Sequence, residues 1–547
     1  MVRYIFSILL LLISITVNAT EYYIAPTTAT PPGSDSNAGT IASPWLTLTK
    51  AWTAVNAGDI IYLRGGTYTN AMMPPTTLLQ NKSGTAGNYI KIYNYPGESP
   101  LIDYSDATFT TQKMALRLIN TDYIHIKGLH IRNMNQPVDG SVAHYGLILW
   151  SDVNNCIFEN LEIDHIGGWG VVIGDLCNNN TFKYVDSHHN SDRYTPEETW
   201  GWSDGFETGS TTSTGTTFIG CRAYWNSDDG WDLRGHNGTV TIDSCWSFLN
   251  GYQPGEKSGD SDIMVHGGNG EGFKLGPKSN PNTTNILRTL TNCLASNNYS
   301  SGFSCNTSTG YYFGINIFNC TSFGSEIGYG FHTDSTMLMT LRNNISYNNL
   351  NEFNDPPVVI HDHNSFDIPI TVTDEDFVSI DSTQLWAARS SNGNLPEITY
   401  LHLASTSDLI DAGTNVYLPY SGLAPDLGAF EYNLPVATTG LGWEPVLSKR
   451  NFKDYVNLPQ SEWMIDAIPV TTTATELNYN VGVTSGIQGQ IDAKAALSAP
   501  AFTTSITVTP GDTTVTAVVG KIVYKTSDNH LYICRQLTAK KWYQLDN

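Results

Sequence analysis

The chain has 547 residues and a formal net charge of −23 at pH 7, and only 14% of its residues are charged. A chain with this net negative charge repels the phosphates of nucleic acids and of anionic membranes. Neither of these partners is therefore expected. A polyanionic substrate could bind only where bound cations or local positive charge offset this net negative charge. The 48 glycines and 29 tyrosines favour an all-β protein with many turns.

Residues 1–19 have the pattern of a secretory signal peptide. Arg3 precedes an apolar stretch from Ile5 to Val17, and the segment ends with Ala19. The sequence therefore predicts a mature chain that starts near Thr20 and is secreted, extracellular, periplasmic or at the cell surface. No other stretch is long and apolar enough to predict a membrane span.

The start of the mature chain predicts a capped solenoid. Residues 51–57 suit a short amphipathic helix, and residues 60–68 read as a buried strand. A helix over the first coil would protect the open end of a stack of strands.

From about 88 to 350, short apolar runs alternate with turns rich in Gly, Asn and Asp. One glycine recurs in each repeat, usually before an apolar residue, and its shortest intervals are 24 and 25 residues. This period, with loops inserted at fixed corners, predicts an all-β parallel β-helix. The expected repeat glycines, called frame glycines below, are Gly146, Gly170, Gly205, Gly230, Gly272, Gly302 and Gly330.

Asparagines and cysteines also recur in step with the repeat. The asparagines are expected to stack at a turn and to satisfy one another's polar groups. Eight cysteines in a secreted chain usually indicate disulfides, but cysteines at equivalent repeat positions favour free, buried, stacked thiols. The residues concerned are Asn190, Asn226, Asn250 and Asn298, and Cys221, Cys245 and Cys293, each five residues before one of these asparagines.

Two insertions fall at one corner of the coil. Segments 191–203 and 251–270 each separate a repeat asparagine from its frame glycine. We expect both loops to overhang the coils that carry the acids described below. Loops on a rigid scaffold commonly bind ligands, so these two loops are candidates for substrate binding.

The repeat pattern fades beyond residue 350. The predicted β-helix domain covers residues 20–432, with a strand expected near 398–403, and residues 433–474 read as a linker. In 475–547, apolar residues three and four apart suggest a short helix or coiled coil that resembles repeats of bacteriophage tail fibres, before a small β-rich tail. This appendage could form a homo-oligomer or tether the protein.

The chemistry is concentrated in three successive repeats. Aligned on glycine, Asp204, Asp229 and Glu271 form one column and Glu207, Asp232 and Lys274 form the next, with Asp228 at the corner. Carboxylates this close repel one another unless a cation lies among them. Calcium suits an all-oxygen site, whereas no His/Cys cluster has the spacing usual for zinc. Each Asp-Gly pair alone is also common turn chemistry.

Lys274 is the candidate general base. A lysine beside a divalent cation loses proton affinity, and the reaction that uses both groups is β-elimination from a uronic acid. Arg234 and His236 could bind the substrate carboxylate, and Trp200 and Trp202 could stack on sugar rings. Trp231 is expected in the core.

These residues resemble polysaccharide lyase family 9, whose members include pectate lyases on a right-handed parallel β-helix. The resemblance rests on residues 226–233, 203–206 and 272–276 and covers about residues 21–432. It implies that Asp204, Asp228, Asp229 and Asp232 are calcium ligands and that Lys274 is the Brønsted base.

The favoured interpretation is a secreted calcium-dependent lyase that acts on a pectate-like polymer. Three alternatives stay open: a lyase for another polyuronate (rhamnogalacturonan, alginate, a glycosaminoglycan or a capsule), a calcium-stabilised β-helical adhesin or fibre without activity, and a hydrolase that uses two acids. The hydrolase is disfavoured because it gives the neighbouring lysine no role.

Overall fold

The computed structural model describes residues 19–432, apart from 76, 197, 211, 277–285, 306–313, 332–337 and 355–358, and five short strands nearer the C-terminus. The chain divides into two units, Met1–Leu441 and Gly442–Asn547. The second unit contains the antiparallel pair β35 (Met464–Ile465) and β36 (Ile468–Pro469) and an antiparallel sheet of β37 (Ile522–Lys525), β38 (His530–Gln536) and β39 (Lys541–Gln544). The signal peptide predicted from the sequence, apart from Ala19, and the fibre-like helix lie outside the described residues. Of the predicted linker 433–474, only β35 and β36 are described.

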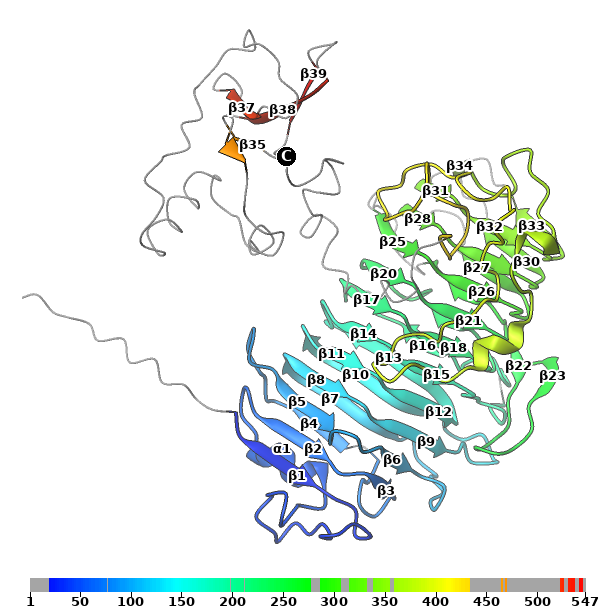
Figure 1. Ribbon diagram of the computed structural model, residues 1–547. Coiled ribbons are helices and arrows are strands. Elements are labelled where there is room, and N and C mark those ends of the chain that lie inside the picture. Colours follow the sequence, from blue (N-terminus) through cyan, green and yellow to red (C-terminus); the bar gives the residue numbers. More distant parts are fainter. Residues whose placement is uncertain are drawn as a thin grey trace, which may run out of the picture. The chain divides into compact units, whose positions relative to one another are not determined.

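The first unit is an all-β parallel β-helix, as the repeat predicted, and its coils stack along one axis (Figure 1). Three parallel sheets form its sides, and most coils contribute one strand to each. Sheet 1 has twelve strands: β1 (Glu21–Ile24), β2 (Ile60–Leu63), β5 (Ile90–Asn94), β8 (Ile124–Lys127), β11 (Ile157–Glu159), β14 (Thr181–Lys183), β17 (Thr216–Ile219), β20 (Val240–Asp243), β25 (Ile286–Thr291), β28 (Gly314–Phe318), β31 (Leu338–Arg342) and β34 (Val359–Asp362).

Sheets 2 and 3 have ten strands each. Sheet 2 contains β4 (Thr77–Gln80), β7 (Met114–Asp122), β10 (His144–Asn154), β13 (Gly168–Asp175), β16 (Phe206–Thr208), β19 (Trp231–Asp232), β24 (Phe273–Lys274), β27 (Ser301–Cys305), β30 (Ile327–Phe331) and β33 (Asn351–Asn354). Sheet 3 contains β3 (Gly66–Tyr68), β6 (Pro100–Asp103), β9 (His130–Met134), β12 (Glu162–Ile166), β15 (Asp186–His188), β18 (Arg222–Tyr224), β21 (Trp246–Phe248), β26 (Leu294–Ser296), β29 (Thr321–Phe323) and β32 (Ile345–Tyr347). Loop 251–270 carries the antiparallel hairpin of β22 (Tyr252–Gln253) and β23 (Ile263–His266).

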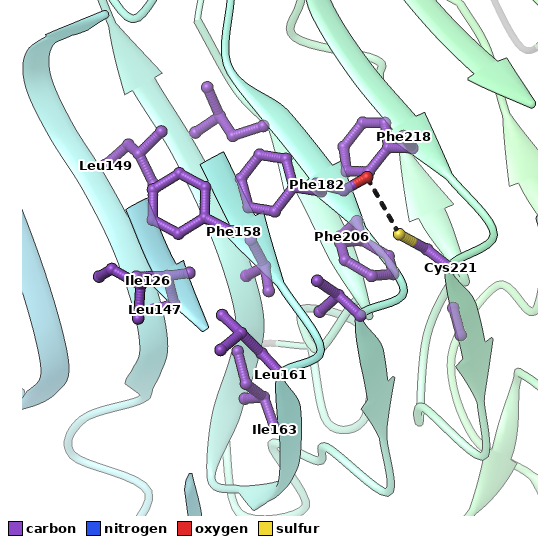
Figure 2. Packing of buried hydrophobic residues seen from close by; sticks show 14 of the residues in the cluster. Ile126, Leu147, Leu149, Phe158, Leu161, Ile163, Phe182, Phe206, Phe218 and Cys221 are labelled. Atoms are coloured by element: carbon purple, nitrogen blue, oxygen red, sulfur yellow. Dashed lines mark hydrogen bonds between the residues drawn. The ribbon is translucent and has the colours of Figure 1, made fainter. Parts of the chain in front are cut away.

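The core runs along the inside of the coils. Phe158, Phe182 and Phe218 stack on successive strands of sheet 1, with ring centroids 4.8 and 5.1 Å apart (Figure 2). Inward side chains repeat at every second residue of a strand, and the strands of successive coils are paired side by side. Equivalent inward side chains of successive coils therefore touch. This stacking explains why one apolar pattern recurs over so many repeats.

The predicted helix is present but begins and ends three residues earlier. α1 spans Leu48–Ala54, and the hydroxyl of Thr47 accepts a hydrogen bond from the Lys50 amide at 3.1 Å. The single strand predicted at 60–68 is two strands, β2 and β3. A corner separates them because Glu98 accepts hydrogen bonds from the side chain of Arg64 and the amide of Gly65.

The asparagine stack is confirmed. Asn190 donates to Asn226, Asn226 to Asn250 and Asn250 to Asn298, at 2.8, 2.9 and 2.9 Å between Nδ2 and Oδ1. All four side chains are buried. The ladder satisfies amides that would otherwise be costly to remove from water.

The frame glycines recur because the turn leaves no room for a Cβ atom. A Cβ on Gly170 would lie 2.0 Å from the Ser187 hydroxyl, and one on Gly302 would lie 2.1 Å from that of Ser322. The last predicted frame glycine was wrong: Phe303 pairs with Tyr329, so the glycine equivalent to Gly302 is Gly328, not Gly330.

The cysteine prediction is also confirmed, because Cys221, Cys245 and Cys293 are buried free thiols. The Cys221 amide approaches the sulfur of Cys245 at 3.3 Å, and that of Cys293 approaches Cys320 at 3.4 Å. The thiol of Cys221 in turn contacts the carbonyl of Phe182 (Figure 2).

Residues 363–432 pack against the outer face of sheet 3. The segment has two short 3₁₀ helices, η1 (Asp374–Asp376) and η2 (Ser382–Trp386), and forms a second apolar cluster with Trp246 and Phe248 of β21. In place of the strand predicted near 398–403, isolated bridges join Ser379 to Tyr400 and Phe377 to Leu403. Among the described residues, no helix is long and apolar enough to cross a membrane.

Candidate active site

The predicted alignment of the three acidic repeats is confirmed. Glu207 of β16 pairs with Asp232 of β19, which pairs with Lys274 of β24, so the three residues form one column on sheet 2. The preceding column also aligns, since the amide of Gly205 donates to the carbonyl of Asp229 and that of Gly230 to Glu271. The in-register strands of sheet 2 therefore bring both columns together.

Four aspartates gather at this place and are called the acid cluster below: Asp204, Asp228, Asp229 and Asp232. Carboxylate oxygens of Asp204, Asp229 and Asp232 all lie within 4.8 Å of one another. Asp228 lies at the corner of the coil, where one of its oxygens accepts a hydrogen bond from the Asn269 amide. All except the half-buried Asp232 are buried.

Burial and mutual repulsion disfavour the charged forms of these acids. Burial raises the pKa of Asp204 well above its ordinary value, and the negative charge of Asp228 adds to this shift. Burial also raises the pKa of Asp229 to about 8, although the ammonium group of Lys274 opposes the shift. Such a group of acids is stabilised by positive charge placed among them.

Lys274 supplies one positive charge. Its Nζ lies 2.7 Å from Asp229, 3.0 Å from Asp232 and 3.6 Å from Glu271, and its side chain is almost fully buried. Burial disfavours the ammonium form, but Asp229 and Asp232 outweigh it and raise the pKa of Lys274 well above its ordinary value. One lysine faces several carboxyl groups, more than its single positive charge can balance when they are ionised.

The donor atoms of the acid cluster fit a hard divalent cation. The acid cluster offers only carboxylate oxygens, which Ca²⁺ prefers and accommodates in flexible numbers. Zinc prefers nitrogen and sulfur ligands, and none is among the four residues. The residues present are therefore suited to calcium, in line with the expectation from sequence.

Both predicted loops reach the site. Within loop 191–203, the carbonyl of Trp200 accepts from the hydroxyl of Ser227 at 3.0 Å. Loop 251–270 contributes the Asn269 amide to Asp228. The loops are also joined, because Arg193 pairs with Glu256 at 3.2 Å and donates to the carbonyl of Pro254 at 2.7 Å. The loops therefore hold the corner at Asp228 in place.

The two predicted substrate-binding residues lie in different environments. Arg234 is exposed, and its amide donates to Asp232 at 2.6 Å, which places it beside the acid cluster. His236 is fully buried. Burial, and then the charge of Arg288, lowers the pKa of His236 to about 3. A neutral, buried imidazole does not present a charge to a sugar carboxylate, so His236 does not fit the predicted role.

An aromatic stack lies next to the acid cluster, and the sequence predicted a stacking role only for its member Trp202. Tyr145, Trp169 and Trp202 stack with centroids 5.0 and 6.1 Å apart. Tyr145 and Trp169 each precede a frame glycine, as do Asp204 and Asp229, so the glycine alignment already contained the signal. Trp231 lies in the core as expected, stacked on Phe206 and Phe273.

Two glutamates of the aligned columns, Glu207 and Glu271, also face this site. Glu207 pairs with Asp232 across the strands, and burial, followed by the charge of Asp232, raises its pKa to about 8. The amide of Glu271 donates to Asp229 at 2.8 Å. Both carboxyl groups therefore belong to the group of acids around Lys274.

Comparison with known proteins gives one consistent family. Residues 27–357 match the model described as "Pel9A-like, right handed beta helix region". A pectate lyase L of Dickeya chrysanthemi is 32% identical over 422 residues, which cover 75% of this chain and 90% of that protein. A pectate lyase PEL9 of Emericella nidulans is 28% identical over 73% of this chain and 96% of its own length.

Two solved structures of polysaccharide lyases are also similar to this chain. The crystal structure of pectate lyase Pel9A is 29% identical, with a TM-score of 0.62, over 76% of this chain and 97% of that one. A rhamnogalacturonan lyase is 26% identical, with a TM-score of 0.59, over 71% and 97%. The matching family model describes a right-handed β-helix. The similarity to pectate lyases disfavours the alternative of a fibre without activity. The chain belongs to polysaccharide lyase family 9 and is a polysaccharide lyase with a right-handed parallel β-helix.

Proposed function

We propose that this lyase is calcium-dependent and cleaves a pectate-like polyuronate by β-elimination. The observation that carries the proposal is the position of Lys274, whose Nζ lies 2.7 and 3.0 Å from two carboxylates of the buried acid cluster. A hydrolase would need two acids in separate roles and leaves this lysine unused.

Asp204, Asp228, Asp229 and Asp232 are the residues that would hold the calcium ion. Bound there, calcium would withdraw electrons from the substrate carboxylate and acidify the hydrogen on the adjacent carbon, C5. The four carboxylates are fixed by the coil and by Asn269, so this arrangement exists before substrate arrives.

Lys274 takes the proton in this mechanism. Nζ of the neutral amine removes the hydrogen from C5 as a proton, and the electron pair of that bond forms the C4–C5 double bond. The bond from C4 to the glycosidic O4 breaks with its electron pair on O4, which leaves and takes up a proton from water. Lys274 must first lose its own proton, which the surrounding carboxylates oppose. Any interaction that neutralises those carboxylates lowers the pKa of Lys274 toward the working pH.

Arg234 is the residue that we propose to bind the substrate carboxylate. It is exposed beside Asp232, and a guanidinium can bind a carboxylate through two parallel hydrogen bonds. Such a contact would also offset part of the negative charge that repels a polyanionic chain.

The polymer is homogalacturonan in the favoured interpretation, and rhamnogalacturonan is the second candidate. The first rests on relatives named as pectate lyases, the second on the similar structure named as a rhamnogalacturonan lyase. We also propose secretion through residues 1–19, which mass measurement of the mature protein would test. The oligomeric role predicted for residues 475–547 stays a prediction.

Absorbance of the unsaturated product tests the function. The protein is incubated with polygalacturonate or rhamnogalacturonan, with added calcium and then with chelator. We expect product from one of these polymers, loss of product with chelator and recovery when calcium is restored. Product that is insensitive to chelator would contradict the calcium dependence, and no product from any uronate polymer would contradict the proposed reaction.

A further inference from the structure

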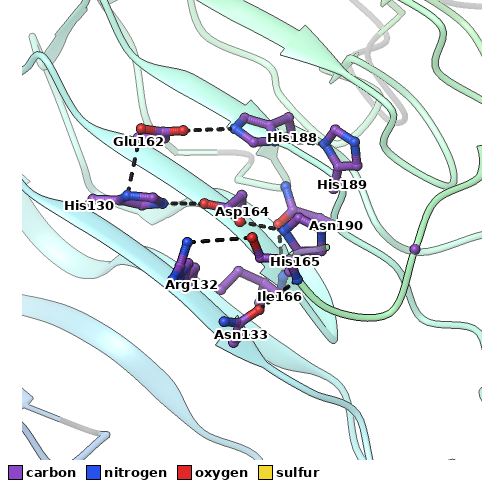
Figure 3. A network of polar contacts seen from close by, with 12 residues as sticks. His130, Arg132, Asn133, Glu162, Asp164, His165, Ile166, His188, His189 and Asn190 are labelled. Carbon is purple, nitrogen blue, oxygen red and sulfur yellow. Dashed lines mark hydrogen bonds and ion pairs between the residues drawn. The ribbon is translucent and has the colours of Figure 1, made fainter. Parts of the chain in front are cut away.

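A second group of metal-binding side chains lies on sheet 3, separate from the acid cluster on sheet 2. His130 of β9 pairs across the strands with Glu162 of β12, and Asp164 of β12 pairs with His188 of β15. Ile131 and Ile163, the residues between, point into the core. The four polar side chains therefore project from the outer face of three successive coils (Figure 3).

The donor atoms in this group converge. Nε2 of His130 is hydrogen-bonded to Asp164, and its Nδ1 lies 3.7 Å from Glu162. Nε2 of His188 lies 3.4 Å from the other oxygen of Glu162. Donors of His130, Glu162 and Asp164 all lie within 4.8 Å of one another. Ligands about 2.1 Å from a tetrahedral zinc ion lie about 3.4 Å apart, which is close to the 3.4 Å from His188 to Glu162 and the 3.7 Å from His130 to Glu162.

The remaining atoms of these side chains are already oriented. The second oxygen of Asp164 is hydrogen-bonded to Nδ1 of His165, and Nδ1 of His188 lies 2.7 Å from Nδ1 of His189. Metal-binding histidines and carboxylates usually have such outer partners, which fix the ring and the tautomer. His189 in turn pairs with Asp262 of loop 251–270 at 3.3 Å.

The group is also accessible from one side. The side chain of Asp164 is only 4% exposed, whereas His130 is 27% and Glu162 is 48% exposed. An ion can therefore enter from solvent past Glu162 and reach the buried oxygen of Asp164. A water molecule could occupy any remaining coordination position.

We propose that His130, Glu162, Asp164 and His188 form a second metal site, selective for Zn²⁺ or a similar transition-metal ion. Mixed imidazole and carboxylate ligands suit such ions, whereas the all-oxygen acid cluster suits calcium. The histidines come from different coils, so their spacing along the chain does not reveal the site.

The role of this site is structural. Loop 251–270 is fixed above the same strands, because the amide of Ser258 donates to the side chain of Asn133 at 3.0 Å and Asp262 pairs with His189. The same loop supplies the Asn269 amide to Asp228. An ion that joins β9, β12 and β15 would therefore brace the loop that reaches the acid cluster.

Equilibrium dialysis of Zn²⁺ tests this proposal on full-length protein that has been treated with chelator and then saturated with calcium. We expect one zinc ion per chain and a higher Tm with zinc, because the ion binds only the folded state. His130→Ala and His188→Ala should each weaken zinc binding about tenfold or more. Co²⁺ bound in place of zinc should give a visible absorption band that these variants lose.

His363→Ala is the matched control, since His363 pairs with Asp362 at an exposed position outside the group. It should leave zinc binding unchanged. Glu162→Gln provides a second test that preserves shape if a histidine variant does not fold. Absence of zinc binding, or equal zinc affinity in wild type and in the folded His130→Ala, His188→Ala and Glu162→Gln variants, would overturn the proposal and leave a network of hydrogen-bonded ion pairs.

Discussion

Asp229 is the acid cluster's most constrained residue. It is fully buried, one of its oxygens accepts from Lys274 at 2.7 Å, and the other accepts from the amide of Glu271 at 2.8 Å. A carboxylate buried this deeply is strongly disfavoured unless positive charge lies beside it. The affinity of the site for a cation therefore depends strongly on Asp229.

Asp229→Asn is predicted to weaken calcium binding about tenfold or more. The change removes one negative charge from the site but keeps the shape of the side chain, and calcium affinity depends on the number of charged ligands. Isothermal titration calorimetry with Ca²⁺ measures the effect. Asp243→Asn is the control: Asp243 is a half-buried aspartate of sheet 1, bonded to Thr291 and Asn292. Equal calcium affinity in the two variants would remove Asp229 from the proposed ligands.

At this scale the sequence predicted most of the candidate site. The acids and Lys274 could be aligned because each lies at a fixed distance from a frame glycine, and the strands keep that register. Whether a side chain is buried, in contrast, does not follow from its distance to a frame glycine. His236 follows Arg234 by two residues, yet only Arg234 is exposed, since the chain turns between them.

At the scale of the coil, the frame glycine and the asparagine ladder depend on the same tight turn. A Cβ on Gly302 would lie 2.1 Å from the hydroxyl of Ser322 and 2.9 Å from the carbonyl of Gly328. These distances are shorter than van der Waals contact, so any side chain at this position must displace its neighbours.

Gly302→Ala is predicted to lower the free energy of unfolding by about 1–3 kcal/mol through overpacking. Ser322→Ala removes the closest clashing atom, so the double variant should recover part of this loss. Urea unfolding of the two single variants and the double variant measures the coupling between the positions. Strictly additive effects would show that the clash with Ser322 is not the cause.

Asn226→Ala is predicted to destabilise the protein by about 1–3 kcal/mol, because it removes the side-chain hydrogen bonds that Asn226 makes with the buried amides of Asn190 and Asn250. Asn178→Ala is the control. Asn178 stacks on Asn154 in the same way, at 2.9 Å, but at a partly exposed position where water can replace the lost contact. Similar losses in both variants, measured by urea unfolding, would contradict the importance of burial.

The elements were predicted where the period is regular and missed where it is not. Gly328-Tyr329-Gly330 contains two glycines two residues apart, and both satisfy the repeat, so only the strand pairing distinguishes them. The helix was placed three residues late because its start depends on the cap at Thr47. The strand expected near 398–403 is held by side-chain packing and isolated bridges, for which a local pattern gives no signal.

At the scale of the first unit, residues 363–432 are fastened to the β-helix by a buried ion triad. Asp186 of β15 accepts from Arg222 of β18 at 2.6 Å and from Arg389 at 3.0 Å. Burial disfavours the charge of Asp186, but the two guanidinium groups outweigh it and hold its pKa well below the ordinary value. The sequence could not predict this triad, because its members are far apart in the chain.

Asp186→Asn is predicted to destabilise the protein by about 3 kcal/mol at pH 7, since it leaves two guanidinium groups without their carboxylate. The pKa of Asp186 is lower in the folded than in the unfolded state. Its contribution is therefore fully present above the unfolded value of about 4 and is lost as pH falls through the folded value.

The difference in unfolding free energy between wild type and Asp186→Asn should hence stay constant from about pH 8 to 5 and shrink below about pH 4. Denaturant titrations across this range measure it. Asp106→Asn, at an exposed position, should change stability by no more than about 0.5 kcal/mol. A difference that grows on acidification would contradict the assigned sign.

Lys274→Arg tests most directly whether Lys274 removes the C5 proton. Arginine keeps the positive charge that faces Asp229 and Asp232 but cannot be deprotonated to act as a base. The measurement is the initial rate of unsaturated product from the polymer that wild type cleaves. Tm and calcium affinity are measured on the same samples, and Lys127→Ala, on sheet 1, serves as a surface control.

We predict that Lys274→Arg lowers the rate about a hundredfold or more, with Tm and calcium affinity close to wild type, and that Lys127→Ala stays active. A folded, calcium-binding Lys274→Arg protein that turns over within about tenfold of wild type would contradict the assignment of Lys274 as the base.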